Sequence, residues 1–110
     1  MEEQFDAIVV GSGISGGWAA MELCKKGLKT IVLERGRQVE HIKDYPTTNL
    51  APWELLHRNQ NTKKLKEDQH IQVRGFCNEA NSHFFVNDKE HPYVQKKPYD
   101  WIRGYHVGGR

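Results

Sequence analysis

Residues 9–20, "VVGSGISGGWAA", join an apolar run to a helical pattern through a glycine-rich turn. The run Ala7–Val10 predicts a strand that is buried on both faces of a parallel sheet. The stretch Ile14–Lys26 predicts a helix with one apolar face, which Gly27 ends. A second apolar run, Thr30–Leu33, predicts a strand parallel to the first and reached by a right-handed crossover. Residues 5–36 therefore form a β-turn-α-β unit, and the predicted fold class is α/β.

The spacing G-x-G-x-x-G in this turn is typical of dinucleotide-binding βαβ units. Gly11 permits the tight turn, Gly13 lets the backbone approach a pyrophosphate, and Gly16 lets the helix pack closely on the strands. The backbone N–H groups of residues 14–16 are expected to point at the diphosphate, aided by the positive end of the helix dipole. Glu34, about 20 residues further on, is expected to accept hydrogen bonds from an adenosine ribose and to repel the 2′-phosphate of NADP. The turn alone leaves FAD and NAD open.

Composition narrows the class of protein further. The chain has 110 residues, of which 37% are hydrophobic, and a net charge of +2. This near balance does not favour a nucleic-acid groove or an anionic membrane as partner. No stretch is apolar enough for a membrane span, and the acidic start lacks the pattern of a secretory signal, so a cytoplasmic location is expected. Two cysteines make no disulfide framework, and the six histidines lack metal-ligand spacing, so no metal site is expected.

The chain divides into three predicted parts. Residues 1–36 are the dinucleotide-binding unit. Residues 37–100 are polar and contain all four prolines, but they also carry several aromatic side chains, which favours an ordered, irregular excursion over a linker. Residues 101–110 end in a second glycine-rich stretch, which predicts a close approach of the backbone to another group.

Several stretches resemble one known family. The opening "DAIVVGSGISGGWAAMEL" followed by "TIVLERG" is similar to the start of FAD-dependent oxidoreductases. The stretches "APWELLHRN", "FFVNDKEHPY" and "DWIRGYHVGGR" resemble a bacterial branch of the glucose–methanol–choline (GMC) oxidoreductases. The resemblance extends over residues 5–110, and its first and last stretches are the most specific.

This resemblance implies a Rossmann-like FAD-binding fold, here a partial, N-terminal fragment, followed by an irregular lid-like segment over the cofactor. In the family the glycine turn holds the FAD diphosphate, the acidic residue matched by Glu34 binds the ribose, and Arg35 lies beside the adenine. A later R-G-x-x-(L/V)-G-G loop passes against the diphosphate and the flavin; it is matched here from Arg103 onward, with Arg110 departing from the Ser or Thr of many members. The predicted cofactor-binding residues are Gly11, Ser12, Gly13, Ile14, Ser15, Gly16, Glu34, Arg35, Arg103, Val107, Gly108 and Gly109.

The family's chemistry implies oxidation of an alcohol or sugar CH–OH group to a carbonyl, with hydride passing to FAD and then to a redox acceptor protein or a quinone. The family's catalytic histidine is expected beyond residue 110, so no catalytic residue is assigned here. His106 is more simply a polar loop residue. The chain alone is expected to be inactive and to retain FAD weakly. Two alternatives stay open: an NAD-dependent dehydrogenase with the same turn, and a non-enzymatic binding module that uses the aromatic-rich middle segment.

Overall fold

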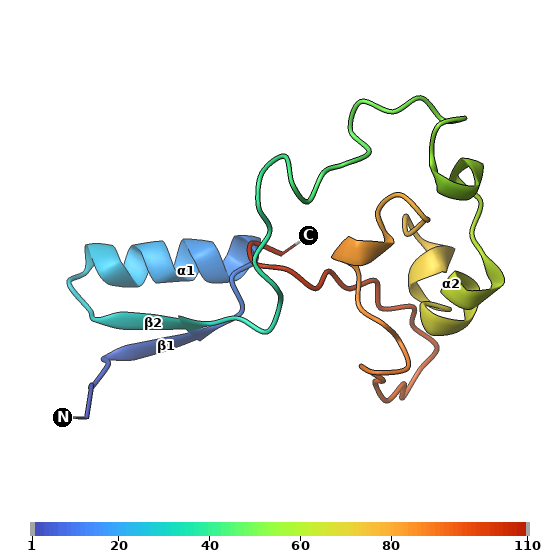
Figure 1. The fold of residues 1–110 in the computed structure, drawn as a ribbon. Helices are drawn as coiled ribbons and strands as arrows, with labels where there is room; N and C mark the ends of the chain where they lie inside the picture. Colours follow the sequence, from blue (N-terminus) through green and yellow to red (C-terminus); the bar gives the residue numbers. More distant parts are fainter. Residues whose placement is uncertain (1, 110) are drawn as a thin grey trace. The chain divides into compact units, whose positions relative to one another are not determined.

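The computed structural model describes residues 2–109, so the predicted loop position Arg110 lies outside the described residues. The described chain forms two compact units: the first consists of residues 2–38 and 105–109, and the second of Val39–Gly104. In chain order the elements are β1 (Ala7–Val10), α1 (Ile14–Lys25), β2 (Thr30–Leu33), η1 (Leu56–Asn59), α2 (Lys63–Asp68), η2 (Gln72–Arg74) and η3 (Ser82–Phe84), where η marks a 3₁₀ helix (Figure 1).

The first unit is one βαβ motif. Strands β1 and β2 pair in parallel, with Ala7 opposite Thr30 and Val10 opposite Leu33. Helix α1 connects them and ends one residue before the predicted end, at Lys25. At that end the Gly27 N–H donates to the Cys24 carbonyl at 2.9 Å, and Gly27 has a φ of +81°. The predicted α/β class and the parallel pair are confirmed.

The prediction that β1 is buried on both faces is wrong for the part of the chain that the structure describes. Val9 is 8% exposed, whereas Ile8 is 65% and Val10 is 83% exposed. Successive side chains of a strand point to opposite faces, so Val9 lies on one face of the sheet and its two neighbours lie on the other. Figure 1 shows α1 along one side of the two strands, which accounts for this one-sided burial.

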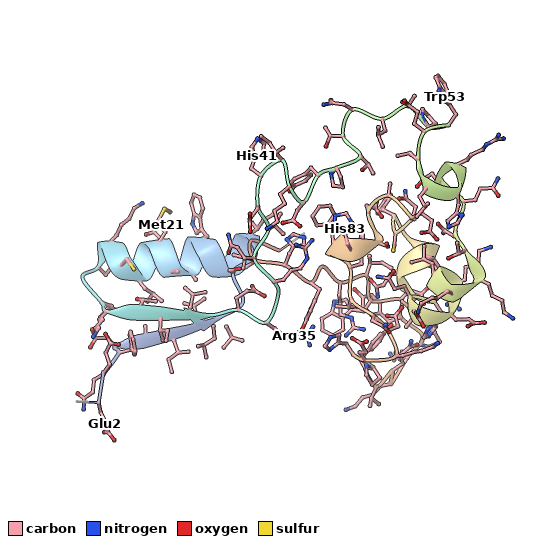
Figure 2. All side chains as sticks on the ribbon, viewed as in Figure 1. Glu2, Met21, Arg35, His41, Trp53 and His83 are labelled. Atoms are coloured by element: carbon pink, nitrogen blue, oxygen red, sulfur yellow. The ribbon has the colours of Figure 1, made fainter. Side chains whose placement is uncertain are left out.

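The second unit has little regular structure. Its longest helix is the six-residue α2, whose N-terminal cap is the Thr62 hydroxyl, which accepts a hydrogen bond from the Leu65 N–H at 3.2 Å. Its buried residues are both apolar and polar: Ile71, Cys77, Val86, Gln69, Gln72, Asp88 and Arg103. Several aromatic side chains of this unit are exposed, such as Trp53, which is 76% exposed and points away from its loop (Figure 2). The interior of this unit therefore combines polar side chains with apolar ones.

Residues 101–104 group with the second unit, whereas 105–109 group with the first. The three-part division of the sequence stays a prediction. No helix among the described residues has the length and apolar character that a membrane crossing requires.

Candidate FAD-binding site

The glycine turn (residues 11–16) connects β1 to α1 and leaves no room for a side chain at Gly16. Gly11 has a φ of +91°, and its N–H donates to the Leu33 carbonyl at 2.7 Å, so it continues the pairing of the two strands. A Cβ on Gly16 would lie 1.9 Å from the Gly11 carbonyl oxygen. Helix α1 thus begins directly against the end of β1. This is the cradle that a diphosphate needs, because backbone N–H groups can reach it without an intervening side chain.

Ile14 and Ser15 form the first turn of α1, and both are exposed. Gly13 precedes them as the N-terminal cap residue, with no side-chain cap. The first N–H groups of a helix lack partners within the helix, and the helix dipole makes this end positive. The start of α1 therefore presents donors and positive potential on its accessible side, as an anionic diphosphate requires.

Glu34 follows β2 directly and folds back onto the glycine turn. Its Oε2 accepts hydrogen bonds from the Ser12 N–H at 2.7 Å and from the Ser12 hydroxyl at 2.6 Å. Its Oε1 accepts one from the Gly36 N–H at 2.7 Å. These bonds, that of the Ser12 hydroxyl foremost, lower the pKa of Glu34 from 4.5 to about 2. The exposed carboxylate is therefore ionised at neutral pH, so it can accept hydrogen bonds from ribose hydroxyls.

The Gly-Gly loop (residues 105–109) lies against the same turn. The Arg37 N–H donates to the Tyr105 carbonyl at 3.4 Å, and the Val107 N–H donates back to the Arg37 carbonyl at 2.8 Å. Further along, the Gly108 N–H donates to the Ser12 Oγ at 2.8 Å. A Cβ on Gly109 would lie 2.8 Å from the Gly13 Cα, so the two backbones meet without side chains between them. The structure thus brings together two predicted glycine segments that lie almost 100 residues apart in the sequence.

Arg35 lies in the first unit, with its guanidinium carbon 5.5 Å from the centre of the Tyr105 ring. Arg35 is exposed and is labelled in Figure 2. A guanidinium over the face of an aromatic ring is attracted to that ring, which restrains the side chain. Such an arrangement is compatible with the predicted place of Arg35 beside an adenine.

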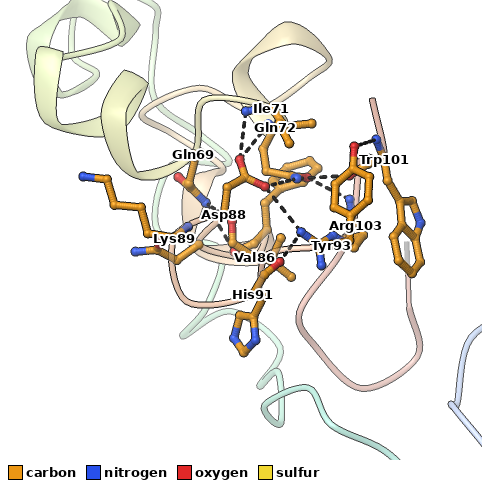
Figure 3. A network of polar contacts seen from close by, with 12 residues as sticks. Gln69, Ile71, Gln72, Val86, Asp88, Lys89, His91, Tyr93, Trp101 and Arg103 are labelled. Carbon is orange, nitrogen blue, oxygen red and sulfur yellow. Dashed lines mark hydrogen bonds and ion pairs between the residues drawn. The ribbon is translucent and has the colours of Figure 1, made fainter. Parts of the chain in front are cut away.

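Arg103 lies in the second unit, inside a buried polar network (Figure 3). Its Nη2 donates to the His91 carbonyl at 2.6 Å and lies 3.5 Å from Asp88 Oδ1. Its guanidinium carbon lies 5.1 Å from the centre of the Tyr93 ring and 5.0 Å from that of the Trp101 ring. At 7% exposure, Arg103 stabilises the second unit; its contact with a cofactor stays a prediction.

Sequence reasoning missed three features of this arrangement. Gly36 supplies an N–H to Glu34, and a Cβ there would lie 2.3 Å from the His106 nitrogen, so the "ERG" stretch carries a second constraint besides its acidic residue. No motif in the sequence indicated that the Tyr105 ring would contact Arg35. Asp88 and Gln72, the centre of the buried network, are unremarkable polar residues in the sequence. Nothing in their spacing could have shown that they meet.

The geometry also bears on a metal site and on the role of His106. No group of three or more His, Cys, Asp or Glu side chains within residues 2–109 is arranged to hold a metal ion. The His106 ring Nδ1 lies 3.1 Å from the Val107 carbonyl oxygen, which fits a role within its own loop.

The comparisons with known proteins decide the family. A family model described as "FAD dependent oxidoreductase" matches residues 6–95, which is most of the chain. The chain belongs to this family. FAD is therefore the cofactor, and the choice between FAD and NAD that the turn left open is made.

The chain is also similar to individual oxidoreductases and related proteins. It is 29% identical over 106 residues to protein FixC of Bradyrhizobium diazoefficiens, an alignment that covers 89% of this chain and 23% of that protein. It is 49% identical over 35 residues to the probable electron transfer flavoprotein-quinone oxidoreductase YdiS of Escherichia coli, covering 32% of this chain and 8% of that protein. It is 64% identical over 31 residues to the long-chain-alcohol oxidase FAO4B of Arabidopsis thaliana, covering 28% of this chain and 4% of that protein.

The chain thus spans less than a quarter of the length of these relatives. No solved structure matches it significantly.

Proposed function

We propose that this chain is the FAD-binding part of a GMC-type oxidoreductase that oxidises a CH–OH group of an alcohol or sugar to a carbonyl. The observation that carries the proposal is the junction of the glycine turn and the Gly-Gly loop, made by the hydrogen bond from the Gly108 N–H to the Ser12 Oγ. These are the two segments that the GMC resemblance assigns to the FAD diphosphate. The name of the similar Arabidopsis protein, a long-chain-alcohol oxidase, agrees with such a donor.

Each part of the first unit has a definite task in this proposal. The turn at residues 11–16 and the first N–H groups of α1 bind the diphosphate, and Glu34 accepts hydrogen bonds from the ribose hydroxyls. Arg35, held on the Tyr105 ring, lies beside the adenine. The Gly-Gly loop covers the turn and excludes water from the diphosphate. When bound, FAD supplies a two-electron acceptor for the hydride of the alcohol carbon.

A second candidate comes from the electron-transfer relatives. The alignment with FixC covers 89% of this chain, and YdiS is named a probable electron transfer flavoprotein-quinone oxidoreductase. In this candidate the same FAD site receives electrons from a reduced redox protein and passes them to a quinone. Both candidates make a quinone or a redox acceptor protein a partner, and they differ in the electron donor.

Anaerobic flavin reduction separates the two candidates. The full-length gene product, loaded with FAD, is mixed without oxygen with a long-chain alcohol, with a sugar, or with reduced electron transfer flavoprotein. The proposal expects the visible flavin absorbance to bleach with an alcohol or a sugar. Bleaching by the reduced protein, with none by any alcohol or sugar, would refute the CH–OH assignment and support the second candidate.

The assignment of the ribose is tested with a pair of variants. Glu34→Ala is expected to weaken FAD binding by about 10- to 100-fold, the effect of losing hydrogen bonds to a charged acceptor. Glu22→Ala is the matched control, because Glu22 is exposed on α1, away from the glycine turn, and pairs with Lys25 at 3.2 Å. Each substitution is made in the full-length gene product, and its FAD affinity is measured by the quenching of flavin fluorescence. Equal affinities in the two variants would exclude Glu34 as the ribose ligand.

A further inference from the structure

The Ser12 hydroxyl connects two parts of the candidate site. It donates to Glu34 Oε2 at 2.6 Å and accepts from the Gly108 N–H at 2.8 Å. A serine hydroxyl has one hydrogen and two lone pairs, so donation to the carboxylate leaves its lone pairs for the amide. A bond to an ionised acceptor is stronger than one between neutral groups, which fixes the rotation of the hydroxyl.

The bond from Gly108 to Ser12 attaches the far end of the Gly-Gly loop to the turn. The beginning of this loop is paired through the Arg37 backbone, and Gly109 bonds within the loop to the His106 carbonyl at 3.2 Å. Alanine at position 12 would leave the Gly108 amide without this acceptor and would remove one of the bonds to Glu34. Ser12, the middle residue of the G-x-G motif, therefore contributes to the site through its side chain as well as through its backbone.

We infer that Ser12 is a positioning residue for FAD, whose hydroxyl holds the ribose-binding carboxylate of Glu34 and the backbone of the Gly-Gly loop in one arrangement. This inference rests on the proposed role of Glu34 toward the ribose. Loss of the hydroxyl frees both groups together. Coupling of this kind makes binding at the ribose depend on the order of the loop that covers the diphosphate.

The charge around Glu34 does not offer another explanation of its ionisation. The turn at residues 11–17 contains no titratable side chain. Of the nearby charged side chains, Arg35 lies over the Tyr105 ring and Arg37 Nη1 donates to the Gln38 carbonyl at 3.2 Å. The ring of His106, in the Gly-Gly loop, lies by the Val107 carbonyl. The causes that lower the pKa of Glu34 are hydrogen bonds from Ser12, Gly36 and Arg35, none of them from a charged side chain.

The stability of the folded chain depends on pH through Glu34. The pKa of Glu34 in the folded chain, about 2, is below its ordinary value of 4.5. The ionised form is thus favoured by folding, and its contribution to stability is complete above pH 4.5 and disappears as the pH falls toward 2. Without the Ser12 hydroxyl, the pKa of Glu34 in the folded chain moves closer to 4.5, so the pH range over which Glu34 affects stability becomes narrower.

Nuclear magnetic resonance of the chain without FAD tests the coupling. The chemical shift of the Glu34 carboxyl carbon reports the pKa of this side chain. In Ser12→Ala, we expect this pKa to rise by about 1 or more, and hydrogen exchange of the Gly108 amide to accelerate by about fivefold or more. Ser12→Thr, which keeps the hydroxyl, is expected to restore both. Thr30→Val is the control, because the Thr30 hydroxyl in the same unit donates to the Leu28 carbonyl at 3.1 Å and not to Glu34. An unchanged pKa and unchanged exchange in Ser12→Ala would overturn the inference.

A double-mutant cycle with FAD separates this inference from the proposed site. If Ser12 acts through Glu34, Ser12→Ala weakens FAD binding in the native chain but has a much smaller effect in the Glu34→Gln background. Additive effects would overturn the inference that Ser12 acts through Glu34 while leaving the FAD site in place. If Glu34→Gln alone leaves FAD affinity unchanged, the ribose assignment fails instead, whatever the resonance data show.

Discussion

Alanine substitution at Gly16 and at the adjacent Gly17 tests how closely α1 begins against the end of β1. A Cβ on Gly16 would lie 1.9 Å from the Gly11 carbonyl oxygen, 2.9 Å from the Gly11 carbonyl carbon and 3.4 Å from the Val9 side chain. The first of these distances is about 1.6 Å shorter than the optimum of about 3.5 Å between non-bonded heavy atoms. On Gly17 the nearest atom to a Cβ is the Ser12 carbonyl oxygen, at 3.9 Å, which is an ordinary contact.

The two substitutions make the same change at neighbouring positions of α1 and differ in this overlap. Both replace glycine by alanine inside a helix, which favours folding by about 1 kcal/mol. Gly16→Ala adds the cost of overpacking, about 1–3 kcal/mol. We expect the upper end of that range, because the obstructing atom belongs to a backbone that is itself bonded to β2: the Gly11 N–H donates to the Leu33 carbonyl at 2.7 Å. Gly17→Ala should therefore be stabilised by about 1 kcal/mol, and Gly16→Ala should be about 3 kcal/mol less stable than Gly17→Ala.

Urea unfolding of the two variants, followed by far-ultraviolet circular dichroism, measures this difference. The free energies of unfolding are compared directly where the slopes against urea concentration agree. Gly16→Ala is also expected to lose FAD binding, because relief of the overlap displaces the turn. Equal stabilities of the two variants would show that α1 does not begin against β1 as closely as the structure has it.

Two further predictions concern the second unit. Burial, with Asp88 and Glu79 nearby, raises the pKa of Cys77 to about 11. At pH 8 a thiol reagent such as dithionitrobenzoate should therefore modify exposed Cys24 alone until the chain unfolds. Rapid modification of both thiols in the folded chain would refute this prediction. Asp88 accepts hydrogen bonds from the Ile71 and Gln72 N–H groups and pairs with Arg103. Asp88→Asn should therefore lower the free energy of unfolding in urea by about 3–5 kcal/mol, whereas Asp100→Asn, in an exposed pair with Arg74, should lower it by less than about 1 kcal/mol. Similar losses in the two variants would contradict the assignment of a buried network.

The βαβ motif could be predicted because each of its elements has a local cause. Apolar runs of four residues make β1 and β2, a helical pattern makes α1, and glycines stand at both of its ends. These signals placed the strands correctly and the end of the helix within one residue. The burial of β1 was mispredicted because burial depends on what covers a face of the sheet, and the residues of β1 do not encode that covering.

The second unit could not be predicted beyond its irregular character. Its order depends on Gln72 and Asp88, whose amide and carboxylate meet at 2.8 Å, and on Arg103, whose N–H donates to Gln72 Oε1 at 2.7 Å. Asp88 and Arg103 are 16 and 31 residues away from Gln72 and fit no periodic pattern. Arg103 was therefore assigned to the cofactor by resemblance alone, whereas the structure shows its partners within the network.

The sequence by itself determined the α/β motif, the glycine turn and the acidic residue after the second strand, because these follow from short-range periodicity and from the steric needs of the turn. Only the tertiary structure decided that the Ser12 hydroxyl stands between Glu34 and Gly108 and that the Gly-Gly loop closes onto Gly13. The physical reason is distance along the chain. A hydrogen bond between residues 96 positions apart depends on where the chain returns after the whole second unit, and no local preference encodes that return.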